Sequence, residues 1–197
     1  MSLLYTADVV TGALSYSSYR HTMRQTLRLP AGDVSAESLL RNTRANIGIM
    51  NRVDGAVRLS PALCMALQKA PRVTWLVISE GWCGDAAYSL PLFAAIENAF
   101  AQKITLRIVL RDSHPDLINA NLTNGGKSIP ILIALDSNRH KLAVWGPRPQ
   151  PLQRLINKLQ GAGRSIPDLI PDVHQWYTND NTATLQEEIR RFVESYS

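Results

Sequence analysis

The sequence has only two cysteines, Cys64 and Cys83, among its 197 residues. A small secreted scaffold held by disulfides uses many more, so this class is disfavoured. The four histidines are scattered, and no cysteine and histidine group has zinc-ligand spacing, so we expect no metal site. No apolar run approaches the length of a membrane span, and residues 1–8 lack the basic start and apolar centre of a signal peptide. We therefore expect a cytoplasmic protein with no membrane partner.

Concentrated charge is also missing. The formal net charge is +5, yet lysine and arginine form no dense run and no platform with aromatic residues. Nucleic-acid binding requires such a footprint, so we expect no nucleic-acid partner and attribute the basic balance to solubility. An affinity for small anionic thiols is compatible with it. The length and the hydrophobic content of 45% indicate one domain with a sizeable core.

Periodicity divides the chain into three parts. Residues 1–71 are predicted to form a helical extension, with Asp54-Gly55 interrupting its second apolar run and Ser60-Pro61 starting a helix that ends near Lys69. Residues 72–160 alternate between strands and helices. The strands are expected at 73–79, 104–110, 131–135 and 141–145, and the helices at about 83–100, 115–122 and 152–159.

The C-terminal part, residues 161–197, is predicted to be a linker followed by one helix. Its first residues, 161–167, indicate a flexible connector because they contain two glycines and a proline. Thr184 and Glu187 have the spacing of a capping box, and the apolar residues after them recur at helical spacing. We expect this helix to pack on the core.

The most informative segment is Trp82-Cys83-Gly84-Asp85-Ala86, between a buried strand and the start of a helix. A cysteine in that position meets backbone N–H groups and the positive end of the helix dipole, which favour its thiolate. We expect its sulfur to be exposed and partly ionised. The charge of Asp85, two residues away, disfavours the thiolate and partly offsets this effect.

Together with three further landmarks, this segment resembles the active site of the thioredoxin superfamily. The landmarks are Pro91 in the following helix, the loop ending at Ile129-Pro130 before a strand, and Gly146 sixteen residues later. The resemblance implies an α/β thioredoxin fold, a central mixed sheet flanked by helices, with an N-terminal helical extension and a C-terminal helix. Ala86 stands where thioredoxins have their second cysteine, so the motif is monothiol.

The resemblance also implies roles for individual residues. Cys83 would be the nucleophile, with Asp85 beside it, and Pro130 would be cis. The expected substrate contacts are Trp82, Gly84, the backbone of Ile129, Pro130, Trp145 and Gly146. Lys127 and Arg148 would then face the carboxylate of a small thiol, although solvated loop charge is the plainer interpretation of each.

The resulting hypothesis is a monothiol oxidoreductase that acts on disulfide-containing proteins or on mixed disulfides with a small thiol. We expect no cofactor beyond a small-thiol co-substrate, and weak or no dithiol reductase activity. The main alternative is a thioredoxin-fold module that binds a peptide or partner without turnover. Less favoured are an iron–sulfur carrier, a peroxidase, and a resolving role for Cys64, which is expected to pack against apolar neighbours. The sequence leaves the substrate, the reductant and the oligomeric state open.

Overall fold

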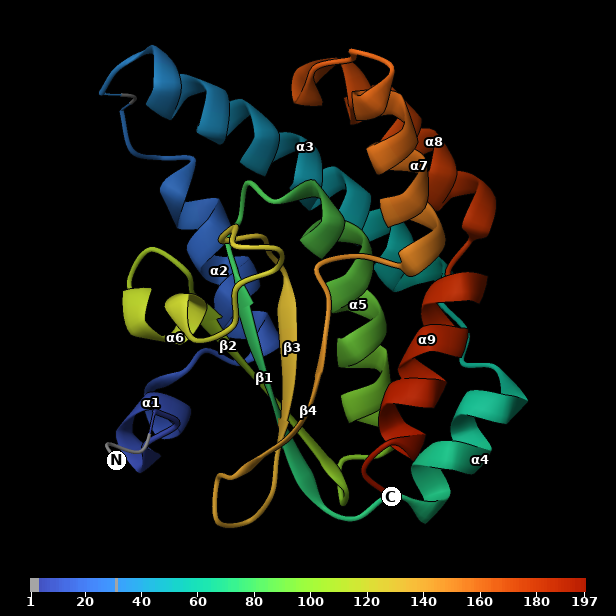
Figure 1. Ribbon diagram of the computed structural model, residues 1–197. Coiled ribbons are helices and arrows are strands. Elements are labelled where there is room, and N and C mark those ends of the chain that lie inside the picture. The colour runs from blue at the N-terminus through green and yellow to red at the C-terminus, as the bar shows by residue number, and fades with distance from the viewer. Residues whose placement is uncertain (1–3, 31) are drawn as a thin grey trace.

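A mixed sheet of four strands lies at the centre of the protein (Figure 1). The structure is a computed structural model that describes residues 4–30 and 32–197. Residues 1–3 and 31 lie outside the described residues. Residues 1–3 belong to the segment for which no signal peptide was predicted, and residue 31 belongs to the predicted helical extension. The strands are β1 (Val73–Ser79), β2 (Ile104–Leu110), β3 (Ile131–Leu135) and β4 (Lys141–Trp145), and their bounds match the prediction.

The strand order is β2-β1-β3-β4. β1 pairs with β2 in parallel, whereas β3 is antiparallel to both β1 and β4. The two central strands are buried almost throughout, because helices cover both faces of the sheet, and their sequences are therefore continuous apolar runs. The predicted α/β fold with a mixed sheet is confirmed.

Helices cover the sheet from both sides (Figure 1). α5 (Gly84–Ala99) and α9 (Ala183–Glu194) lie on one side, and α2 (Tyr16–Thr26) and α6 (Pro115–Asn119) on the other. The remaining helices are α1 (Ala7–Gly12), α3 (Val34–Ala56), α4 (Pro61–Lys69), α7 (Gln150–Gly161) and α8 (Ile166–Asp180). α3, α7 and α8 lie near the end of the sheet where β1 leads into α5, and α4 lies near the opposite end. No helix of the described residues is long and apolar enough to cross a membrane.

The N-terminal region is helical as predicted, but Asp54-Gly55 does not interrupt α3. The Asp54 carboxylate accepts hydrogen bonds from Tyr16 (2.8 Å) and from Arg20 (2.5 Å) on α2. These bonds hold the last turn of α3 and offset the modest cost of a glycine inside a helix. The predicted cap at Ser60 and the end of α4 at Lys69 are confirmed. α6 ends at Asn119, three residues earlier than expected.

The C-terminal region differs most from prediction, because α8 was not foreseen. The connector expected over 161–167 is shorter, since α7 ends at Gly161 and α8 begins at Ile166 with a capping box between Ser165 and Asp168. The capping box predicted at Thr184 and Glu187 does not form. The Asp180 carboxylate accepts from the backbone N–H of Thr184 (3.0 Å), and Glu187 pairs with arginines of its own helix.

The C-terminal helix α9 belongs to the core, as predicted. Trp75 of β1 is fully buried and meets Phe93 of α5 and Phe192 of α9 edge-on, each at a centroid distance of 5.9 Å. Its indole N–H donates to the Tyr196 hydroxyl over 3.0 Å. Aromatic contacts of this kind join the last helix to the first strand.

We predict that Phe192→Ala lowers the free energy of unfolding by about 3–5 kcal/mol, as expected for removal of a buried aromatic side chain. The control is Arg191→Ala, which removes an exposed neighbour on the same helix and should cost under about 1 kcal/mol. Urea unfolding of the two variants measures both values. Equal, small losses in both variants would show that α9 is not part of the cooperative core.

Candidate functional site

Cys83 lies at the junction of β1 and α5, where it is the N-cap residue of the helix. Its Sγ donates a hydrogen bond to the backbone carbonyl of Ile129 over 3.2 Å. The Ile129–Pro130 peptide bond is cis. The fold thus brings together the cysteine and the proline loop, which are 46 residues apart in the sequence.

The expectation of an exposed, partly ionised sulfur is wrong. Only 7% of Cys83 is exposed, and this burial is the largest of the effects that raise the pKa of its thiol, to about 12. The negative charge of Asp85 raises this pKa further. The N–H of Ala86 and the charge of Arg148 act in the opposite direction, but they do not outweigh the loss of solvent. The resting thiol is therefore protonated at neutral pH.

Asp85 is a buried carboxylate with strong partners, not only a favourable residue in the first turn of α5. Arg148 donates a hydrogen bond from Nε to its Oδ2 at 3.0 Å, and Nη2 of Arg148 forms an ion pair with the same oxygen at 2.7 Å. The Tyr177 hydroxyl donates to Oδ1 at 2.8 Å. Burial raises the pKa of Asp85, while Arg148 and Tyr177 lower it. The carboxylate therefore joins α5, the loop after β4 and α8 beside the sulfur.

Two further aromatic residues extend this network along α8. Tyr88 of α5 stacks on Tyr177 with a centroid distance of 4.3 Å, and its hydroxyl lies 3.0 Å from Nδ1 of His174. Burial lowers the pKa of His174. Sequence reasoning missed His174 and Tyr177 because α8 was not predicted. Their spacing of three residues would have placed them on one face of a helix.

The N-terminal extension holds the loop that precedes Cys83. Asn46 of α3 is buried, and its Nδ2 donates to the carbonyl of Gly81 over 3.0 Å. Gly81 fits closely against Met23 of α2, since a Cβ added there would lie 3.1 Å from Met23 Cγ. Tyr19 of α2 contacts Ser79 through its hydroxyl at 3.3 Å. The helices of residues 1–71 thus fix the position of the loop that precedes Cys83, a role that the sequence did not indicate.

A cavity of about 610 Å³ opens beside the cysteine. Of the predicted site residues it is lined by Trp82, Cys83, Gly84, Asp85, Ile129, Lys127 and Arg148. Arg111, which was not predicted, lies over the Trp82 ring at 4.7 Å from its centroid. Other lining residues come from α3, α7 and α8, so segments outside the predicted 72–160 core complete the cavity.

Trp145 and Gly146, two of the predicted substrate contacts, lie outside the lining of this cavity. Trp145 is buried, packs edge-on against Phe93, and donates its indole N–H to Glu188 of α9 at 2.9 Å. Gly146 has a φ of +126°, and a Cβ there would lie 2.3 Å from the carbonyl oxygen of Pro130. Neither residue lines the cavity, nor does Pro130. In this structure these residues pack the loop after β4 against the loop that contains Pro130.

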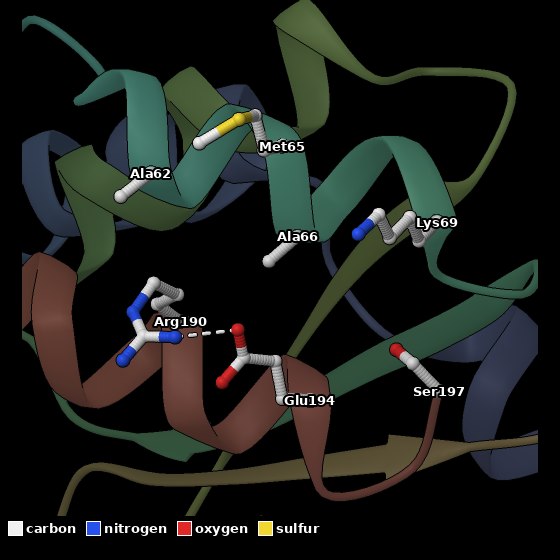
Figure 2. A pocket seen from close by; sticks show the side chains of 7 residues that line it. All are labelled: Ala62, Met65, Ala66, Lys69, Arg190, Glu194 and Ser197. Carbon is white, nitrogen blue, oxygen red and sulfur yellow. Dashed lines mark hydrogen bonds and ion pairs between the residues drawn. The ribbon is translucent and has the colours of Figure 1, made fainter.

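Cys64 lies on α4, near the opposite end of the sheet from the start of α5 (Figure 1). Both cysteines are free. A second cavity, of about 320 Å³, lies between α4 and α9 (Figure 2). There Arg190 pairs with Glu194, and no cysteine or histidine is among its lining residues. Within residues 4–30 and 32–197, no group of three or more histidine, cysteine or acidic residues has a metal-binding arrangement.

Comparison with known proteins defines the family. The family described as thioredoxin matches residues 33–170, which is more than half of the chain. The protein therefore belongs to the thioredoxin family. No curated protein matches the sequence.

Two solved structures resemble the whole fold. One is a protein of unknown function from Pseudomonas aeruginosa, with a TM-score of 0.58 and 16% identity over 93% of this chain and 99% of that one. The other is an HIV epitope scaffold, with a TM-score of 0.57 and 19% identity over 93% of this chain and 100% of that one. At these identities the likeness concerns the fold alone.

We predict that Asn46→Ala destabilises the protein by about 1–3 kcal/mol, because the partly buried Gly81 carbonyl loses its donor. Asn42→Ala is the matched control, since Asn42 is an exposed residue one turn earlier on α3. Urea unfolding gives the two free energies, and hydrogen exchange at residues 81–83 reports the loop directly. Unchanged hydrogen exchange at residues 81–83 in Asn46→Ala would show that α3 does not position this loop.

We predict that Asp85→Asn speeds alkylation of Cys83 by iodoacetamide at pH 8. The substitution removes the negative charge that raises the thiol pKa and leaves Arg148 without its counter-charge, and both changes favour the thiolate. Each unit of lowered pKa should raise the rate about tenfold. Mass mapping separates Cys83 from Cys64, and circular dichroism checks folding. Asp116→Asn, an exposed carboxylate on α6, should leave the rate unchanged. A slower reaction in a folded Asp85→Asn protein would contradict this account.

Proposed function

We propose that this thioredoxin-family protein is a monothiol thiol–disulfide oxidoreductase with Cys83 as its nucleophile. The observation that carries the proposal is the contact of Cys83 Sγ with the Ile129 carbonyl, beside the cis-proline and on the lining of a large cavity. A ligand in the cavity would lie next to both residues. Trp82 and Gly84, which also line the cavity, would bound its path to the sulfur.

The chemistry follows from having one thiol in the site. The Cys83 thiolate attacks a disulfide R–S–S–R′, forms Cys83–S–S–R and releases R′–S⁻, which takes up a proton. Ala86 offers no second thiol, so an external small thiol attacks Cys83–S–S–R. This second exchange restores Cys83 and carries R away as a mixed disulfide with the reductant. The external thiol supplies the reducing electrons, and no other cofactor is required.

Burial of the sulfur restricts which substrates react. A thiol with 7% exposure is reached more easily by a small molecule in the cavity than by a disulfide on the surface of a folded protein. Mixed disulfides with small thiols are therefore the favoured substrates. The cytoplasm, which is rich in small thiols, is the compartment that suits this reaction.

A non-catalytic binding module is the second candidate. The protonated state of Cys83 favours it, because a neutral thiol that donates to a backbone carbonyl is a weak nucleophile. This module would hold an extended peptide or a small molecule without turnover. Its binding would survive replacement of the sulfur by oxygen.

We predict that the wild-type protein accelerates the reduction of hydroxyethyl disulfide by glutathione above the uncatalysed rate. Cys83→Ser should abolish the acceleration, whereas Cys64→Ser should retain it. The catalysed rate should rise about tenfold per pH unit between pH 7 and pH 9, since the thiolate fraction grows in that way below a raised thiol pKa.

Equal rates in the wild-type and Cys83→Ser proteins would rule out the oxidoreductase. Retained ligand binding in both proteins would then favour the binding module. Reduction of insulin should be slow or undetectable, because it requires the resolving thiol that Ala86 replaces.

A further inference from the structure

One wall of the cavity beside Cys83 is aliphatic and comes mainly from α8, whereas α7 contributes Ile156 and the polar residues Gln153, Asn157 and Gln160. Ile166 and Ile170 of α8 are 68% and 47% exposed and lie on this wall. Ile156, Leu169 and Val173 continue the wall where the helices pack together. These two isoleucines lie on one face of α8, next to the cavity, and are exposed to solvent. They form an apolar surface that no other part of the described structure covers.

The loops that follow β2, α6 and β4 line another part of the same cavity with positive charge. Arg111, Lys127 and Arg148 are its cations, and Asp85 is its one carboxylate. Arg148 is already engaged by Asp85, and Arg111 pairs with Asp112 outside the lining. Lys127 is exposed and takes part in no ion pair among the described residues. The cavity therefore offers an apolar wall together with an excess of positive charge.

We propose that this cavity binds a small aliphatic molecule that ends in a carboxylate. Its chain packs on the isoleucines of α8, and its carboxylate lies at Lys127 and Arg111. A volume of about 610 Å³ lies within the usual range for pockets that bind small molecules. If Cys83 is the nucleophile of the proposed function, the disulfide that it exchanges is carried on an aliphatic acid.

The pairing of the two features selects this ligand class. A small hydrophilic thiol leaves Ile166 and Ile170 in water and gains nothing from the wall. A neutral hydrocarbon covers the wall but leaves the cationic side without a partner. A molecule with both parts satisfies both surfaces, and each adds affinity that the other cannot supply.

The test measures the binding of octanoate by calorimetry to the wild-type protein and to Cys83→Ser. Octanoate carries no sulfur, so its binding does not depend on the reactivity of Cys83. We expect both proteins to bind it with similar affinity. Octanol, which lacks the charge, and acetate, which lacks the chain, should both bind more weakly. Octanoate binding no tighter than that of octanol or acetate would overturn the proposal.

Matched variants locate the ligand. Lys127→Gln should weaken octanoate binding about twofold to fivefold, as expected for loss of an exposed ion pair. Its control is Lys158→Gln, which changes an exposed lysine of α7 outside the cavity lining and should leave octanoate binding unchanged. Ile170→Ser should weaken binding as well, whereas Leu142→Ser, with similar exposure on β4, should not. If each variant and its control change octanoate affinity equally, the ligand does not bind at the proposed site. A dimer that Ile170→Ser dissociates, with no octanoate binding, would instead identify the wall as an interface between two copies.

Turnover is a separate measurement. The disulfide of 8-mercaptooctanoate should have a kcat/KM at least several times that of hydroxyethyl disulfide, and Ile170→Ser should reduce this preference. Octanoate binding without any Cys83-dependent turnover would contradict the oxidoreductase but keep the ligand class. Turnover with no preference between the two disulfides would keep the oxidoreductase and contradict the substrate class.

Discussion

The buried carboxylate of Asp85 is the interaction on which the arrangement of this site depends. It receives one hydrogen bond each from Arg148 and Tyr177 and forms an ion pair with Arg148, and these partners lie 63 and 92 residues further along the chain. A carboxylate with so little solvent is tolerated only when its oxygens are paired. The loop after β4 and helix α8 therefore both contact the first turn of α5 and satisfy this buried carboxylate. Their docking also buries the sulfur of Cys83 and builds the cavity beside it.

Because of this constraint, the effects on the pKa of the Cys83 thiol differ from those that the motif suggests. A cysteine at a helix N-terminus gains from the dipole and from backbone donors, and these contributions act on Cys83 as well. Here the same helix start carries Asp85, and α3, α7 and α8 surround it. Loss of solvent and a nearby negative charge outweigh the local donors. The thiol is consequently protonated and donates a hydrogen bond to the Ile129 carbonyl.

The sequence predicted those parts of the fold that local patterns determine. The four strands are apolar runs between clear breaks, and the Ser60-Pro61 cap is a local signal, so both were placed correctly. α8 was missed because the two glycines and the proline of residues 161–167 suggest a connector, although Pro167 lies in the opening turn of α8, where proline is tolerated. The contacts of Asp85 and the burial of Cys83 depend on segments distant in the chain. No local pattern contains that information, nor the placement of Trp145 against Glu188.

The most direct test of the account is the pKa of the Cys83 thiol, followed through the Cβ chemical shift of Cys83 in a pH titration by NMR. The account predicts that the shift stays constant up to about pH 10, since the midpoint lies near 12. A midpoint below about 8.5, the ordinary value for a cysteine, would show that the sulfur is solvated or stabilised as a thiolate. That result would contradict the central claim that Asp85 and the surrounding helices keep this thiol buried and protonated.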